Sequence, residues 1–188
     1  MLRVVGSLLR RLARLWATDL RYRWSNYRHR GSLLSTNVRE DLYPETIPDL
    51  KKTAAELHKN FVYTRDGFFR LYDSIDTPAN CWNRAFNPGP LKDDCDGFHA
   101  ALYWAACKNF ECYLVTIVST DIVKSHTALW LPRVGIMDYT RLHEGDDLNL
   151  TVEKVKKSRH ISGIFHVELS KWAGDRWGSH EIVSMEQP

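Results

Sequence analysis

The spacing of apolar residues changes partway along the chain. In residues 48–60, Leu50, Ala54 and Leu57 recur at the spacing of one helix face, and residues 96–108 repeat this pattern. Both segments are therefore predicted to be helices. The segment between them, residues 73–90, is punctuated by proline and glycine and predicts a loop with at most one helical turn.

The second part of the chain favours strands. Residues 112–118, 126–131 and 136–140 are rich in residues that prefer β-structure, and residues 163–169 predict a fourth strand. Residues 132–135 form a Pro- and Gly-containing turn, so the second and third strands are predicted to make a hairpin. Helices followed by a run of antiparallel strands argue for an α+β fold.

The N-terminal segment has a different character. Residues 2–24 predict an amphipathic helix with arginines on one side and apolar residues on the other. Such a helix can pack on its own domain, or dock on an anionic membrane surface or a protein partner. An arginine-rich start is also typical of organelle transit peptides, and these alternatives stay open. We divide the chain into a basic arm (1–31), a connector (32–47) and a main domain (48–188).

Charge and hydropathy narrow the function classes. Residues 1–31 hold eight Arg and one acid, Asp19, a balance of +7, whereas the net charge of the whole chain is only +3. Nucleic-acid binding by the domain itself is therefore not expected. No run reaches the roughly 18 apolar residues of a membrane-spanning helix, and the first apolar run is too short for a secretory signal. We expect a cytoplasmic protein, or one attached to a membrane or an assembly.

One of the four cysteines stands out by its position. Cys107 and Cys112 lie among apolar residues and predict core packing, and Cys81 is expected to be structural. Cys95 instead follows a Pro/Gly-rich loop and opens a predicted helix. A helix N-terminus stabilises a thiolate, and its N–H groups can hold the oxyanion of a tetrahedral intermediate. A chain of 188 residues does not need disulfides for stability, so thiols are expected.

A base and its partner follow along the chain. His126 opens a predicted strand, and Asp138 lies on the next strand across the turn. A hairpin places such residues about 5 Å apart, so the carboxylate can orient the imidazole toward Cys95. His99 follows Cys95 by one helical turn and is not expected to be the base, because it lies on the same helix.

Three short motifs resemble those of the transglutaminase-like superfamily. Residues 94–98 (D-C-D-G-F) are similar to its G-D-C-x-D/E-F/Y element. Residues 126–130 resemble its H-x-x-L/V strand, and residues 136–139 resemble its strand ending in Asp before an aromatic residue. The resemblance covers roughly residues 50–142. It implies a papain-like fold, in which the nucleophile-bearing helix packs on an antiparallel sheet.

The upstream segment resembles bacterial transglutaminase-like cysteine proteinases through residues 73–78, Trp82 and Pro90. The chain also departs from the superfamily pattern at two places. Asp93 stands where the pattern has Gly, and Gly97 stands where it has an acid. These departures leave the subfamily open.

Other site residues are candidates of two kinds. The oxyanion candidates precede Cys95 and are Trp82, Asn83 and Asn87. The substrate-groove candidates, for which core packing is the alternative, are Trp104, Trp130 and Tyr139. The predicted chemistry requires no cofactor. Some members of the resembled family bind calcium through acids at the positions of Asp94 and Asp96, which also suit a helix N-cap and first turn.

These residues predict a thiol-dependent acyl-transfer enzyme, with a cysteine peptidase acting on a protein or peptide as the first choice. A protein cross-linking transglutaminase is an alternative. A cell-wall amidase or endopeptidase is another, because its D-C-S-G-F/L motif resembles residues 94–98, although the Gly-Asp-Leu turn that such enzymes carry before the histidine is missing here. A catalytically inactive papain-like scaffold, attached by its basic helix, is the non-enzymatic alternative.

Overall fold

The computed structural model describes residues 39–64, 76–87, 89–119, 125–162, 164–174 and 177–183. The predicted amphipathic helix at residues 2–24 lies outside the described residues, as do the basic arm and the first part of the connector. In the described part, no helix has both the length and the apolar character needed to cross a membrane.

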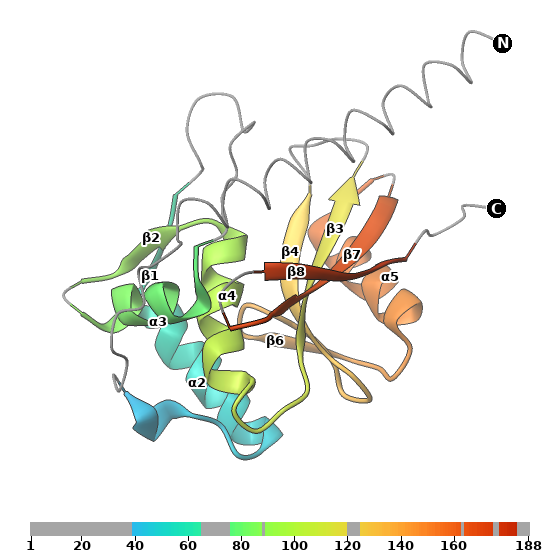
Figure 1. The fold of residues 1–188 in the computed structure, drawn as a ribbon. Coiled ribbons are helices and arrows are strands. Elements are labelled where there is room, and N and C mark those ends of the chain that lie inside the picture. Colours follow the sequence, from blue (N-terminus) through green and yellow to red (C-terminus); the bar gives the residue numbers. More distant parts are fainter. Residues whose placement is uncertain are drawn as a thin grey trace, which may run out of the picture.

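The elements alternate between helices and strands before a run of strands, and the fold is mixed α+β, as predicted (Figure 1). The helical elements are η1 (Glu40–Leu42), α2 (Ile47–Lys59), α3 (Pro78–Phe86), α4 (Cys95–Ala106) and α5 (Leu148–Arg159). The strands are β1 (Phe61–Tyr63), β2 (Leu91–Asp93), β3 (Tyr113–Ser119), β4 (His126–Leu131), β5 (Gly135–Asp138), β6 (Arg141–Glu144), β7 (Ile164–Trp172) and β8 (Trp177–Val183).

Six strands form one antiparallel sheet in the order β6-β5-β4-β3-β7-β8. The β4–β5 hairpin pairs Leu131 with Gly135 and Leu129 with Met137. Gly135 has φ +141°, and a side chain there would lie 2.2 Å from the His143 carbonyl oxygen on β6. Only glycine fits at this position without strain, and its lack of a side chain lets β6 approach β5 closely here. A separate parallel pair joins β1 to β2.

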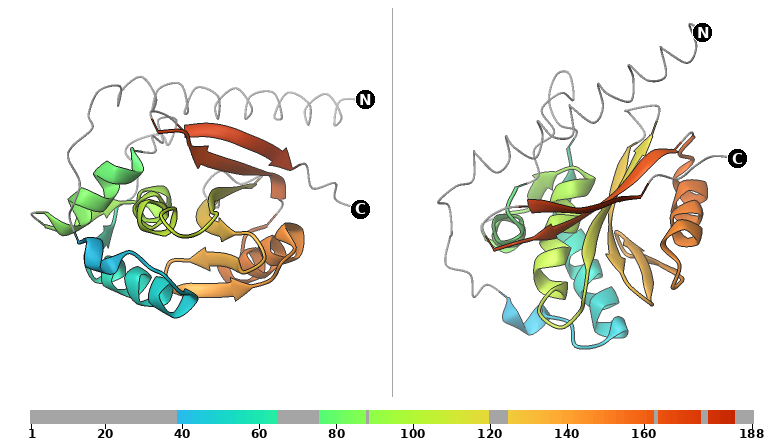
Figure 2. Two further views of the ribbon diagram at one scale, coloured as in Figure 1. Left: turned by 60° about the horizontal axis from the view of Figure 1, so that its bottom comes forward. Right: turned by 45° about the vertical axis from the view of Figure 1, so that its right-hand side comes forward.

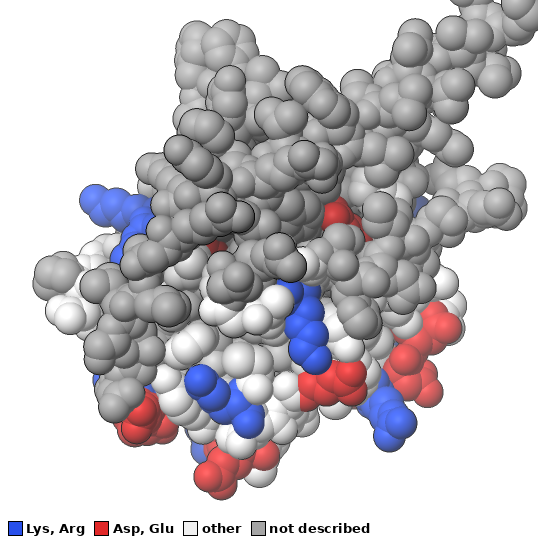
Figure 3. All heavy atoms as spheres, viewed as in Figure 1, with Lys and Arg blue, Asp and Glu red and all other residues white. Residues whose placement is uncertain are grey.

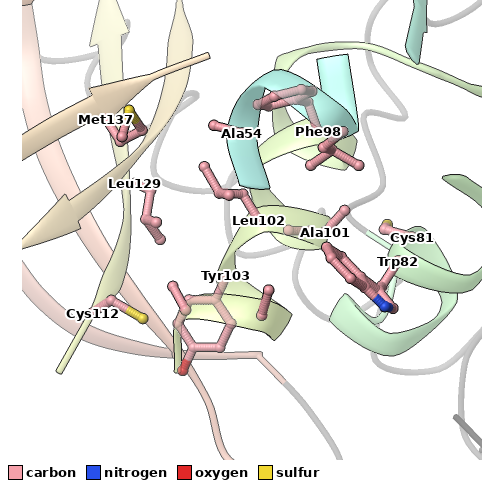
Figure 4. Close-up of a cluster of buried hydrophobic side chains, with 14 of the residues drawn as sticks. Ala54, Cys81, Trp82, Phe98, Ala101, Leu102, Tyr103, Cys112, Leu129 and Met137 are labelled. Carbon is pink, nitrogen blue, oxygen red and sulfur yellow. The ribbon is translucent and has the colours of Figure 1, made fainter. Parts of the chain in front are cut away.

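Helix α4 packs against the sheet on one side and against helices α2 and α3 on its other sides (Figure 2). A helix surrounded in this way is buried on all sides, and the five consecutive residues 98–102 of α4, which point in all directions around the helix axis, are all fully buried. Figure 4 shows Leu102 between Leu129 of the sheet and the helical residues of this core. The opposite face of the sheet packs against α5 in a second apolar cluster.

Several elements were not predicted from the sequence. The segment predicted as a loop contains α3, a helix of nine residues. Its Thr77 side chain accepts a hydrogen bond from the Asn80 N–H, and Pro78 occupies the first turn, so local capping makes the prolines compatible with a helix. Helix α5 begins in the same manner, because Asp147 accepts from the Leu150 N–H. Strands β1, β2, β6 and β8 were also missed.

Candidate active site

The Asp94–Cys95–Asp96 segment starts helix α4. Asp94 is the N-cap residue, and its carboxylate accepts a hydrogen bond from the Asp96 N–H at 3.0 Å. Cys95 is therefore the first residue of the helix and is half-buried. The backbone N–H of Thr127, on strand β4, donates to the Cys95 Sγ at 3.4 Å. This contact brings the thiol beside the residue that follows His126.

His126 is bonded to Asp138 across the hairpin. The His126 Nε2 lies 2.9 Å from the Asp138 Oδ1. Because Leu129 pairs with Met137, Asp138 faces His126 diagonally rather than directly, which is still within reach of a long side chain. Since Nε2 is taken by the carboxylate, Nδ1 is the ring nitrogen that remains for a thiol.

Arg159 fixes the carboxylate from the opposite side. Its Nε and Nη2 donate to the two oxygens of Asp138 at 2.6 and 2.7 Å, in a bidentate pair. Burial raises the pKa of Asp138, but the hydrogen bonds from His126 and Arg159 outweigh it and hold the pKa well below its usual range. Asp138 is thus an ionised, doubly held acceptor. Arg159 ends a helix that was not predicted, so sequence reasoning missed it.

His99 connects the start of helix α4, which carries Cys95, to the end of strand β5, which carries Asp138. It is fully buried, with Nδ1 2.6 Å from the Cys95 carbonyl oxygen, and its Nε2 accepts a hydrogen bond from the Tyr139 N–H at 2.9 Å. Burial lowers the pKa of His99 to about 3, so the ring is neutral and Nδ1–H donates to Cys95. Both ring nitrogens are occupied, and His99 links the backbone of Cys95 to the backbone of Tyr139, the residue after Asp138.

A cleft of about 760 Å³ lies at this candidate site. Cys95, His126 and Asp138 all line it. The remaining lining residues are His58, Phe61, Tyr63, Ser125, Tyr139, Thr140, Arg141, Arg159 and Ile161. One part of the wall is therefore aromatic and another is cationic.

The other predicted site residues are distributed unevenly. Tyr139 lines the cleft, whereas Trp104 and Trp130 do not. Trp104 is half-buried and donates from its indole N–H to the Tyr43 hydroxyl at 3.2 Å, and Trp130 belongs to the core against α5. The alternative of core packing holds for Trp130. The oxyanion candidates Trp82, Asn83 and Asn87 lie on or just after α3, and none of them lines the cleft.

The acids around Cys95 serve the start of the helix. Ligand atoms of Asp93, Asp94 and Asp96 lie within 4.8 Å of one another. Asp93 accepts from the Asp94 N–H at 3.0 Å, and Asp94 accepts from the Asp96 N–H, so two of the three carboxylates already bind backbone groups. Ca²⁺ takes six to eight oxygen ligands, and these three acids supply too few for a complete site. Calcium binding stays a prediction.

The two departures from the superfamily pattern are linked in space. A side chain built on Gly97 would lie 2.3–2.6 Å from the side-chain atoms of Asp93. The Asp93 carboxyl therefore fills the space in which an acid at position 97 would begin. Burial raises the pKa of this carboxyl to about 6. The Asp93 side chain thus occupies the space beside the first turn of α4 that the glycine at position 97 leaves open.

This arrangement predicts strong coupling between positions 93 and 97. Gly97→Ala should destabilise the protein by about 1–3 kcal/mol, because the new methyl group overlaps the Asp93 side chain. In an Asp93→Gly background, which also removes the Cβ that would lie 2.6 Å from the new methyl group, the same change should cost much less. Urea unfolding of the two single variants and the double variant measures the coupling. Additive effects of the two changes would contradict this packing.

The low pKa of Asp138 predicts a specific acid lability. Because the pKa in the folded state lies below the unfolded value of about 3.9, the stabilisation is fully present above that pH and is lost as the pH falls through the folded pKa. The difference in unfolding free energy between wild type and Asp138→Asn should shrink as the pH falls from about 5 to 2.5. Asp146→Asn, at an exposed position, is the control, with an expected effect under about 0.5 kcal/mol. If the difference in unfolding free energy between wild type and Asp138→Asn grew as the pH fell, Asp138 would not have a lowered pKa in the folded protein.

Comparison of the chain with known proteins found no similar family, protein or structure. No protein-family model matches the chain. Searches among curated proteins and among solved structures also found no match. The case for a function therefore depends on the geometry of the cleft and on the motifs in the sequence.

Proposed function

We propose that this protein is a cysteine peptidase that cleaves an amide bond of a protein or peptide through Cys95, His126 and Asp138. The observation that supports it best is the His126–Asp138 hydrogen bond in the same cleft as Cys95. The carboxylate is buried and held by Arg159, the imidazole is bound through one nitrogen, and the thiol lies at a helix N-terminus. This is the nucleophile, base and orienting acid of a triad.

The first half of the reaction forms a thioester. Nδ1 of His126 takes the proton of the Cys95 thiol, and the sulfur attacks the carbonyl carbon of the amide. The negative charge passes to the carbonyl oxygen, which the first-turn N–H groups of α4 would stabilise. His126 then gives its proton to the leaving amine as the C–N bond breaks.

The second half releases the acyl group. Water enters the cleft, gives a proton to Nδ1 and attacks the thioester, and the proton returns to the sulfur as the acid leaves. Asp138 stabilises the imidazolium in both halves because it accepts from Nε2 and stays ionised. If an amine replaces water, the same intermediate gives cross-linking, so hydrolysis and transfer differ only in the acceptor.

The cysteines provide a direct test of this proposal. Burial raises the pKa of Cys81, Cys107 and Cys112, whereas Cys95 lies at a helix N-terminus in an open cleft. Iodoacetamide at pH 7 should alkylate Cys95 at least about tenfold faster than Cys107, the half-buried control. Mass spectrometry of tryptic peptides gives each rate. Slow and uniform alkylation of all four cysteines would favour an inactive scaffold instead.

Activity can be measured without knowing the substrate. Wild-type protein incubated with a proteome-derived peptide library should generate new amino termini, and Cys95→Ala should generate none. Asp138→Ala should slow cleavage by about 10²–10⁴-fold, because the imidazole loses the group that orients it. A biotinylated alkyl amine in the same reaction reports transfer in place of hydrolysis. Unchanged cleavage by Asp138→Ala would exclude the triad.

A further inference from the structure

The cleft has a cationic side next to the proposed triad. Arg141 and Arg159 line it, and Asp138 is the only carboxylate among the described residues of its wall. Asp138 is already bound by His126 and Arg159. It therefore does not compensate the charge of Arg141, which is exposed at the rim.

A second hollow continues this cationic side. It has a volume of about 510 Å³ and shares Arg141 with the first cleft. Its wall also carries Lys154 and Lys157 of α5, against one carboxylate, that of Glu144. Strand β6 and the last turns of α5 thus form a cationic track, which we define as Arg141, Lys154, Lys157 and Arg159.

Two of the four cations of this track have neutral partners, whereas Arg159 is paired with Asp138. Arg141 donates to the Ser158 hydroxyl at 3.3 Å, and Lys154 donates to the backbone carbonyl of Glu144 at 2.6 Å. Within the described residues, neither Arg141 nor Lys157 has a carboxylate within 4 Å. Their charges remain available to an anionic ligand. On the part of the described surface visible in Figure 3, by contrast, basic and acidic side chains are interspersed.

We propose that the cationic track binds acidic residues of the substrate, so that the enzyme prefers peptides with Asp or Glu beside the amide that it cleaves. This inference rests on the proposed function and adds the substrate class. Guanidinium groups bind carboxylates through paired hydrogen bonds, and a one-signed groove concentrates oppositely charged ligands. An acidic peptide fits better than a nucleic acid, because the track opens into the cleft of the nucleophile, which needs an amide carbonyl.

Matched peptidyl epoxysuccinates, which alkylate thiols and can carry a peptide on either side of the electrophile, test the preference. Three sets carry two Glu, two Gln or two Lys residues at the same positions. The Glu probe should label Cys95 at least about tenfold faster than the Lys probe at low ionic strength, and the ratio should fall as salt is added. Arg141→Gln combined with Lys157→Gln should reduce the ratio at least about threefold.

The controls separate this inference from the proposed function. Lys51→Gln combined with Lys52→Gln removes two exposed charges from α2 that line neither hollow, and should keep the ratio. Iodoacetamide, which is small and uncharged, reports the reactivity of Cys95 alone. Rapid alkylation by iodoacetamide with equal rates for the three probes would overturn the acidic preference and leave the peptidase standing. Slow alkylation by iodoacetamide would overturn both.

A binding measurement gives a second, independent result. The Cys95→Ala variant should bind a fluorescent hexaglutamate peptide more tightly than a hexalysine peptide of the same length, as measured by fluorescence anisotropy. The preference should weaken in the Arg141→Gln and Lys157→Gln background. If an oligothymidylate of equal charge binds more tightly than hexaglutamate and loses binding in that background, the track serves nucleic acid and the peptide assignment is wrong.

Discussion

The buried carboxylate of Asp138 is the constraint on which the candidate site depends. An isolated ionised carboxylate in a protein interior is strongly unfavourable, and it persists only when other charges and hydrogen bonds compensate it. Arg159 supplies the charge, and His126 supplies a further donor at 2.9 Å. The same pair that offsets the burial of Asp138 also fixes the imidazole. Removing Arg159 would leave a buried charge with no permanently charged partner, compensated only by His126 and by the His143 Nε2 that lies 3.9 Å from it.

A second interaction that holds the candidate site together is made by the neutral imidazole of His99. Helix α4, which carries the Cys95 thiol, and strand β5, which carries the Asp138 carboxylate, belong to different parts of the fold. His99 connects them through the Cys95 carbonyl and the Tyr139 N–H. Tyr139 has φ +51°, an uncommon conformation for a residue with a side chain, and its ring lies 6.1 Å from that of His126. The hydrogen bond to His99 helps to hold this turn in place.

Local signals were sufficient for the parts of the fold with simple periodicity. Helix α4 and strands β3 to β5 were predicted close to their observed bounds, because apolar spacing and the Pro–Gly turn are visible in the sequence. Helix α3 was missed because its capping Thr77 stands inside a proline-rich segment. Arg159 could not be assigned because α5 is mostly polar and its last turn reads as a solvated surface. Only the three-dimensional structure shows that one of its cations turns inward to Asp138.

The contact between positions 93 and 97 shows why a linear motif is an incomplete description of such a site. A motif compares residue types at fixed places along the chain, and by that measure Asp93 and Gly97 are two departures. In space they are one arrangement, because the carboxyl of Asp93 lies where a side chain at position 97 would begin. The two positions beside Cys95 are thus packed against each other, and the residue at one of them limits what the other can hold.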